Sequence, residues 1–235
     1  MSTSKTRITW LGHATVLVQT AKGTNVLIDP FIAHNPKYPP SFSLPSKIHY
    51  VLLTHGHGDH ISDAVPVAQK HGAKVAAIYE LADYVGRKGV AETIGFNLGG
   101  SAELDDVRVT MVDAKHSAAA ADDNGSHYVG VAVGFVMTIA GGPVLYHAGD
   151  TCVFGDMQLI HQLYAPQVAM LPIGGFYTMD PKEAALACRL LQPKTVLPIH
   201  WGTFPPLKGT PQELAKLVEP GVKVVQWKPG DEFEA

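Results

Sequence analysis

The chain has 235 residues, which is enough for a domain with a substantial core, and its 46% hydrophobic and 17% charged residues exclude a disordered protein. Its 18 Lys and Arg against 21 Asp and Glu give a formal net charge of −3. This weak negative charge excludes the basic surface that nucleic-acid binding requires, so we expect no nucleic-acid partner. The 12 histidines are an unusually large number and give the first indication of metal chemistry.

The first half of the chain predicts an antiparallel hairpin followed by strands that alternate with helices. Apolar residues, alternating or continuous, predict strands at residues 8–10, 15–18, 25–28, 50–54 and 74–78. Helices are predicted from Ser62 to Gly72 and over residues 80–88. The proline-rich segment 35–45 predicts a surface loop near a pocket.

The second half contains the clearest helix starts. Asp180 and Thr210 each precede a proline and stand three residues before a glutamate, the pattern of a capping box; these helices are expected to end before Pro193 and Pro220. Strands are predicted at residues 107–112, 128–139, 144–147, 195–199 and 223–227, with a further strand beginning at residue 168.

The two halves echo each other weakly, because in each a hairpin is followed by a strand, a helix and another strand. This repetition predicts an α/β protein with two layers packed sheet against sheet and helices on the outer faces. No linker separates the halves, so we expect one domain over residues 1–235.

Several absences predict where the protein acts. Residues 1–19 have no apolar core of the signal-peptide type, and the longest apolar stretch, residues 128–139, is too short to span a membrane. Cys152 and Cys188 are too few for a disulfide framework or a thiolate zinc site. We therefore expect a cytoplasmic protein that does not act at a membrane.

A dense run of polar side chains follows the predicted strand at residues 50–54. Four metal-ligand side chains fall within six residues, namely His55, His57, Asp59 and His60, separated by glycines that let the backbone fold tightly. Two imidazoles two residues apart can point the same way from an extended backbone. The adjacent Asp59 and His60 must diverge, which suits a second ion beside the first.

Three more ligand candidates follow predicted strands, where binding crevices form in α/β folds. They are His116, Asp150 and His200. Each is weak evidence alone, and their shared position after strands is what makes them a set.

This pattern resembles the metallo-β-lactamase superfamily of metal-dependent hydrolases over essentially the whole chain. Segments 10–15, 96–100, 172–175 and 198–203 resemble one branch of it, which includes many bacterial and archaeal hydrolases and is similar to the ascorbate-phosphate lactonases and the N-acylphosphatidylethanolamine phospholipases D. The resemblance implies an αββα sandwich of two mixed sheets with two divalent metal ions at one edge.

The resemblance also implies a role for each ligand candidate. The implied ligands of the first ion are His55, His57 and His116, those of the second are Asp59, His60 and His200, and Asp150 bridges both. Nitrogen and oxygen ligands without thiolate favour zinc, with manganese, iron and nickel as alternatives. Two such ions with two carboxylates and a hydroxide carry a net positive charge, which favours an anionic small-molecule substrate.

Other side chains near the predicted site have less specific patterns. His13 and His147 are candidates for orienting a ligand or for facing the substrate, and Tyr177 and Trp201 are candidates for substrate contact. Ordinary packing is the alternative for each of them.

The predicted function is hydrolysis of an ester, lactone, amide or phosphoester bond by a hydroxide held between two metal ions, with Asp59 and Asp150 as the catalytic carboxylates. Two alternatives stay open. One is an oxidative enzyme with a single iron, and the other is a metal-binding protein without catalysis. The sequence carries no interface signature, so homo-oligomerisation stays open as well.

Overall fold

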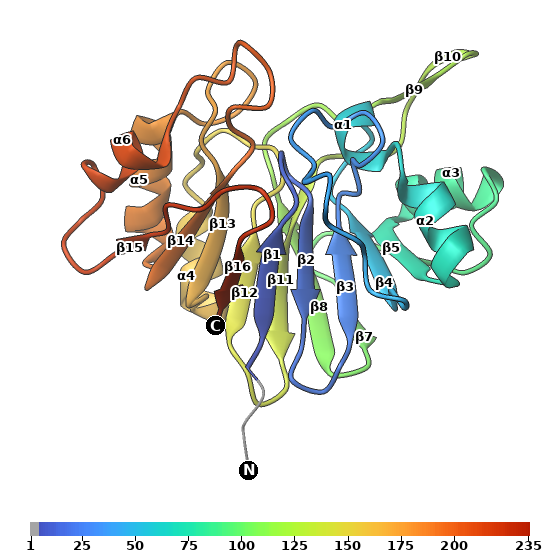
Figure 1. The fold of residues 1–235 in the computed structure, drawn as a ribbon, viewed down its shortest axis with the longest axis horizontal. Helices are drawn as coiled ribbons and strands as arrows, with labels where there is room; N and C mark the ends of the chain where they lie inside the picture. The colour runs from blue at the N-terminus through green and yellow to red at the C-terminus, as the bar shows by residue number, and fades with distance from the viewer. Residues whose placement is uncertain (1–4) are drawn as a thin grey trace.

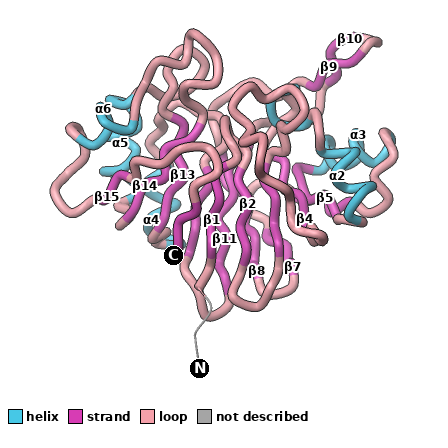
Figure 2. The backbone as a smooth tube through the Cα atoms, in the orientation of Figure 1, coloured by secondary structure: helices cyan, strands magenta, loops and turns pink. Residues whose placement is uncertain are grey.

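Two sheets of seven strands each face one another in the computed structural model, which describes residues 5–235 (Figure 1). Helices flank the strands on the outer faces (Figure 2). The predicted αββα sandwich of two mixed sheets is therefore confirmed. Residues 1–4, the beginning of the segment considered for a signal peptide, lie outside the described residues.

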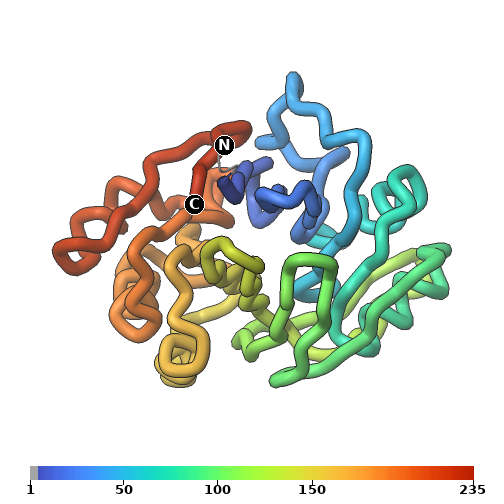
Figure 3. The backbone as a smooth tube through the Cα atoms, turned by 90° about the horizontal axis from the view of Figure 1, so that it is seen from below, coloured from blue at the N-terminus to red at the C-terminus, as the bar shows by residue number. Residues whose placement is uncertain are grey.

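The first sheet has the strand order β16-β1-β2-β3-β4-β5-β6. Its antiparallel part consists of β16 (Glu232–Glu234), β1 (Arg7–Trp10), β2 (Val16–Gln19) and β3 (Asn25–Ile28). Its parallel part continues from β3 through β4 (Tyr50–Leu53), β5 (Lys74–Ile78) and β6 (Thr93–Phe96). The C-terminal strand thus lies beside the N-terminal one, as the view from below also shows (Figure 3).

The second sheet has the order β15-β14-β13-β12-β11-β8-β7. Its antiparallel part consists of β7 (Ser101–Leu104), β8 (Val107–Asp113), β11 (Val133–Ile139) and β12 (Val144–His147). Its parallel part adds β13 (Val168–Pro172), β14 (Thr195–Ile199) and β15 (Lys223–Val224). Each sheet therefore contains a hairpin that leads into parallel strands, which confirms the predicted echo.

The helices cover the parallel ends of the two sheets (Figure 1). Beside the first sheet lie α2 (Ala64–His71) and α3 (Tyr79–Arg87), and beside the second lie α4 (Met157–Tyr164), α5 (Pro181–Leu191) and α6 (Pro211–Ala215). Both predicted capping boxes are present, at Asp180 and Thr210. Among residues 5–235, no helix combines the length and the apolar character needed to cross a membrane.

Strands β13 and β14 of the second sheet are buried on both faces, which explains their continuous apolar runs. Successive side chains of a strand point to opposite faces. Val168 and Met170 of β13 pack into the core between the sheets, whereas Ala169 and Leu171 pack into the core under α4 and α5. Strand β13 thus contributes side chains both to the core between the sheets and to the core between its sheet and the helices.

Several predicted boundaries were wrong. The helix expected from Ser62 begins at Ala64 as α2, with Asp63 rather than Ser62 at its N-cap position. The Asp63 carboxylate accepts hydrogen bonds from Ile32 N and Ala33 N of a neighbouring loop, and the short α1 (Gly58–Ile61) lies before the predicted span. The strand expected over residues 128–139 begins at Val133. The strand expected over 223–227 ends at Val224.

Some elements were not predicted, and most of them are short or exposed. They are α1, α4, the edge strands β6, β7 and β16, and the ribbon of β9 (Ala120–Asp122) and β10 (Gly125–His127), which projects from the body (Figure 1).

Candidate metal centre

The candidate ligands meet where loops leave the ends of strands from both sheets. The loops after β1, β3 and β4 belong to the first sheet, and those after β8, β12 and β14 belong to the second. All seven ligand candidates of the sequence analysis lie in these loops or in α1. The structure therefore brings together side chains that are separated by up to 145 residues of sequence.

The loop after β4 is packed tightly under the chain that leads to β9. A Cβ atom on Gly56 would lie 2.5 Å from Val129 Cγ2 and 2.6 Å from Ala118 O, so only glycine fits there. A Cβ atom on Gly58 would meet open space. Close packing therefore requires glycine at position 56, as predicted, but not at position 58.

One group of three imidazoles joins this loop to the second sheet. The ligand atoms of His55, His57 and His116 all lie within 4.8 Å of one another. The Nε2 atom of His55 lies 3.0 Å from Nδ1 of His57. Ser117 Oγ lies 3.3 Å from the other ring nitrogen of His57, so the residue after His116 also contacts the group.

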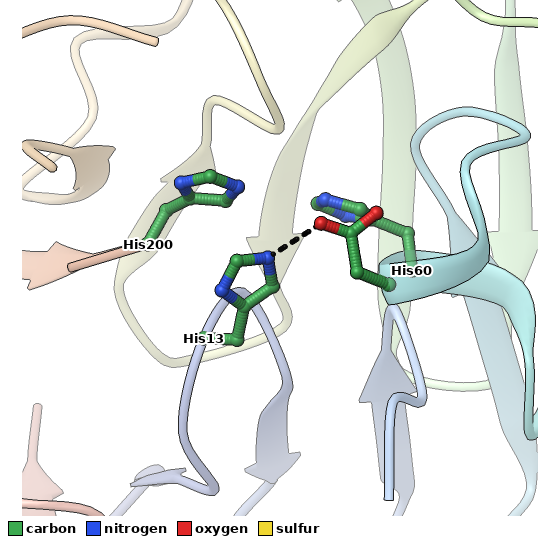
Figure 4. A group of neighbouring side chains, drawn as sticks. His13, His60 and His200 are labelled. Atoms are coloured by element: carbon green, nitrogen blue, oxygen red, sulfur yellow. Dashed lines mark hydrogen bonds and ion pairs between the residues drawn. The ribbon is translucent and has the colours of Figure 1, made fainter. Parts of the chain in front are cut away.

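A second group lies on the other side of His60. The ligand atoms of Asp59, His60, His200 and also His13 lie within 4.8 Å of one another. Figure 4 shows the rings of His13, His60 and His200 converging from three separate segments of the chain. The rings of His13 and His200 are 3.9 Å apart between centroids.

Asp150 connects the two groups. Its Oδ2 atom lies 3.1 Å from His200 Nε2, 3.5 Å from His60 Nε2 and 3.6 Å from His116 Nε2. One carboxylate oxygen is thus within reach of imidazoles from both groups, which is the position a bridging ligand occupies.

Buried polar atoms without hydrogen-bond partners are rare, because desolvation leaves them uncompensated. Among the described residues, such atoms include His60 Nε2, Asp150 Oδ1 and His200 Nδ1. A cation would satisfy these lone pairs. The nitrogen and oxygen donors also suit a divalent ion such as zinc, so this donor set fits a metal centre.

The charges of the group are strongly coupled. Burial lowers the pKa of His55 well below its ordinary value, and the neighbouring His60 lowers it further. Burial raises the pKa of Asp150, but His200 and His60 outweigh it and hold that pKa well below its usual range. Both shifts favour the protonation states in which imidazoles and carboxylates bind metals.

Asp29 is a site residue that the sequence analysis missed. It is buried at the end of β3, with φ of 46°, and its Oδ2 lies 2.8 Å from His60 Nδ1. Thr54 N and Thr54 Oγ1 donate to the two oxygens of this carboxylate at 2.8 and 2.7 Å. The position of Asp29 directly after a buried strand was the available signal.

Thr54 connects Asp29 to a second imidazole. Its hydroxyl donates to Asp29 and lies 3.0 Å from His55 Nδ1, so it accepts a hydrogen bond from that nitrogen. This arrangement leaves Nε2 of His55 with a lone pair for an ion. Hydrogen bonds of this kind orient metal ligands and fix their tautomers.

His13 contacts Asp59 through a hydrogen bond. Its Nε2 lies 3.0 Å from Asp59 Oδ2 and its Nδ1 lies 3.0 Å from Thr203 Oγ1, a partner that the sequence did not suggest. Its backbone oxygen accepts from Trp10 Nε1 and His200 N, each at 2.8 Å. Burial and His200 lower the pKa of His13 to about 4, so the ring is neutral.

The other three candidates lie in different surroundings. His147 is buried, accepts from Gly149 N at 3.1 Å and lies 3.2 Å from Ala14 O, so it braces two site loops. Trp201 stacks on Trp10 with centroids 5.3 Å apart. Tyr177 lines the cavity above the candidate ligands.

This cavity has a volume of about 650 Å³. It is lined by His57, Asp59, His116, Ser117, Asp150, Tyr177, His200, Phe204 and Pro206. Candidate ligands therefore form its floor, and a small substrate can reach them from solvent.

Comparisons with known proteins agree with this geometry. The model of a family described as the β-lactamase superfamily domain matches residues 24–201. A UPF0173 metal-dependent hydrolase of Koribacter versatilis is 49% identical over 225 residues, covering 96% of each chain. One of Methanopyrus kandleri is 45% identical over 233 residues, covering 97% of this chain and 99% of that protein.

A solved structure is similar over the full length. Igni18, a metallo hydrolase from the archaeon Ignicoccus hospitalis, superimposes with a TM-score of 0.83 at 36% identity, covering 99% of this chain and all of that one.

Proposed function

The chain belongs to the β-lactamase superfamily and is a metal-dependent hydrolase, and on this premise we propose that two divalent ions, zinc in the first place, are held in the candidate centre. The proposed reaction is hydrolysis of an ester, lactone, amide or phosphoester bond in a small anionic substrate. Residues 1–235 are proposed to act as one domain.

The observation that carries the proposal is the position of Asp150. One of its oxygens lies within 3.6 Å of three imidazoles, and the other is buried without a partner among the described residues. The proposed ligands of the first ion are His55, His57 and His116, and those of the second are Asp59, His60 and His200. Asp150 is proposed to bind both.

When bound, such ions supply a water of lowered pKa and polarise the scissile bond. The protein's own contribution is to orient and to move protons. His13 donates from Nε2 to Asp59 and thereby fixes its carboxylate at the cavity floor. We assign Asp59, which is one-third exposed, the role of accepting a proton from the attacking water and passing it to the leaving group as the bond breaks.

The assignment is tested with Asp150→Asn, which keeps the size of the side chain and removes its charge. Plasma mass spectrometry on protein purified without chelators should find two metals per chain in the natural protein and one or fewer in the variant. Turnover of phosphodiester, phosphomonoester and lactone probes should fall at least about a hundredfold.

The matched control is Asp123→Asn, because Asp123 is exposed on the projecting ribbon. It should keep both metals and full activity. Retention of two metals by Asp150→Asn would contradict the bridging role, and a single iron without hydrolysis in the natural protein would contradict the proposed reaction.

A further inference from the structure

A second cavity, which is shallow, wide open to solvent and about 700 Å³ in volume, adjoins the candidate metal cavity. Pro206 lines both of them. Phe176 lines the second cavity and its neighbour Tyr177 lines the first, with the two rings edge to face and 4.7 Å apart between centroids. These two aromatic rings therefore stand between the candidate ligands and the second cavity.

The backbone at Phe176 is strained. Its φ is 61°, in the left-handed region that bulky side chains avoid, and Tyr177 N donates to Gly175 O at 2.7 Å across it. This is the γ-turn with positive φ, which is rare for a non-glycine residue. The ring is nevertheless 78% exposed, so burial in the free protein does not compensate for the strain.

The surrounding chain keeps the turn in place. Gly175 N donates to Met179 O, and the buried Met179 donates from its own nitrogen to Thr151 O, beside Asp150. On the other side, a Cβ atom on Gly174 would overlap His200 O. The turn is thus anchored to two segments that carry candidate ligands, and strain maintained in this way is typical of binding sites.

The lining of the second cavity indicates what it binds. Four apolar side chains line it, those of Phe176, Pro181, Pro206 and Leu217. Its charged residues are Asp180, Lys182, Lys208 and Glu213, whose formal charges cancel. Both carboxylates lie at helix starts, where Asp180 accepts from Glu183 N and Glu213 accepts from Thr210, and their negative charges offset those of the two lysines.

From these observations we propose that the second cavity binds the part of the substrate that does not react, and that this part is an uncharged apolar group with a flat face, such as an aromatic ring. Phe176 contacts this group and determines specificity, whereas Tyr177 contacts the segment that leads to the scissile bond. This inference rests on the proposed metal centre.

The test uses hydroxamates, which bind zinc through one common head group. Calorimetry on the zinc-loaded protein compares acetohydroxamate, 3-phenylpropanohydroxamate and succinic monohydroxamate, which differ only in the tail. The phenyl compound should bind about tenfold tighter than the other two. Phe176→Asn, which tolerates the positive φ, should reduce this preference to about twofold and leave acetohydroxamate binding unchanged.

Two further variants complete the experiment. Phe176→Tyr, which keeps an aromatic ring, should retain the preference for the phenyl tail. Tyr79→Asn, at another exposed aromatic residue, should leave that preference unchanged. Equal affinities for all three tails, preference for the carboxylate tail, or equal weakening of every ligand by Phe176→Asn would each overturn the inference. If no hydroxamate binds, the metal centre itself is wrong and the inference fails with it.

Discussion

At the scale of single residues, the site depends on hydrogen bonds that reach the outer nitrogens of its imidazoles. Asp29 contacts His60, Thr54 contacts His55, and Thr203 contacts His13. Each contact fixes a ring orientation from outside the group of candidate ligands. Asp29 and Asp150 contact the two ring nitrogens of His60 from opposite sides. Burial lowers the pKa of His60, but these two carboxylates outweigh burial and raise that pKa well above its ordinary value.

Asp29→Asn removes the negative charge of this side chain and keeps its size and shape. Asparagine tolerates the positive φ of this position, and its single oxygen can still accept from Thr54 N, so the fold should be retained. Loss of the carboxylate should weaken metal binding about 10- to 100-fold, as measured by competition with a chelating indicator. An unchanged metal affinity would show that Asp29 serves folding only.

At the scale of elements, the loop after β4 and helix α1 determine where four of the candidate ligands lie. His55 and His57 leave an extended segment, whereas Asp59 and His60 lie on α1, so the change from strand to helix separates the two pairs. Gly56 lets this loop approach the chain before β9 closely. The position of His55, His57 and His116 relative to one another therefore depends on the absence of a side chain at Gly56.

Two glycines of the same loop provide a matched comparison. Gly56→Ala should lower the free energy of unfolding by about 1–3 kcal/mol, because its Cβ would meet Val129 and a backbone oxygen. Gly58→Ala meets open space and should leave stability unchanged or raise it by up to about 1 kcal/mol. Urea unfolding followed by circular dichroism measures both, and equal effects would contradict this difference in packing.

Much of the element order could be predicted from the sequence, for physical reasons that differ between elements. The strands at residues 25–28, 74–78 and 195–199 were predicted with their observed bounds, because each contains an uninterrupted run of apolar residues. Edge strands β6 and β7 are partly exposed and carry no such pattern. Helix α4 has Asp156 at its N-cap position, but this side chain makes no capping hydrogen bond and no capping-box glutamate follows it.

The site residues likewise divide into those with a recognisable sequence pattern and those without one. Side chains that follow strands could be identified as a set, and the structure brings them together. Asp29 also follows a strand and could have been added to this set, although its contact with His60 could not be assigned. Thr203 could not be identified, because it is 190 residues from His13 in sequence and only the fold makes them neighbours.

At the scale of the whole molecule, the candidate ligands connect the two sheets. His55, His57, Asp59 and His60 follow strands of the first sheet, whereas His116, Asp150 and His200 follow strands of the second. Ions bound between them would stabilise the packing of one sheet against the other. Metal binding and folding are therefore expected to be linked.

Metal removal tests this linkage. With free zinc at about a thousand times the Kd of a site, each bound ion adds about 4 kcal/mol to the stability of the folded state, which corresponds to about 10 °C in Tm for a chain of this size. Chelation should lower Tm by this amount in a thermal scan, and added zinc should restore it. Asp150→Asn should show a smaller shift, and an unchanged Tm in the natural protein would exclude the linkage.

The pairing of β16 with β1 also has a consequence for protein synthesis. Arg7 and Glu234 are partners in the first sheet, although almost the whole described chain lies between them. At about 5–20 residues per second, the ribosome needs on the order of tens of seconds to make that intervening chain. During this interval one edge of β1 offers unpaired backbone groups to other nascent chains. The final step in completing the first sheet therefore awaits the synthesis of β16.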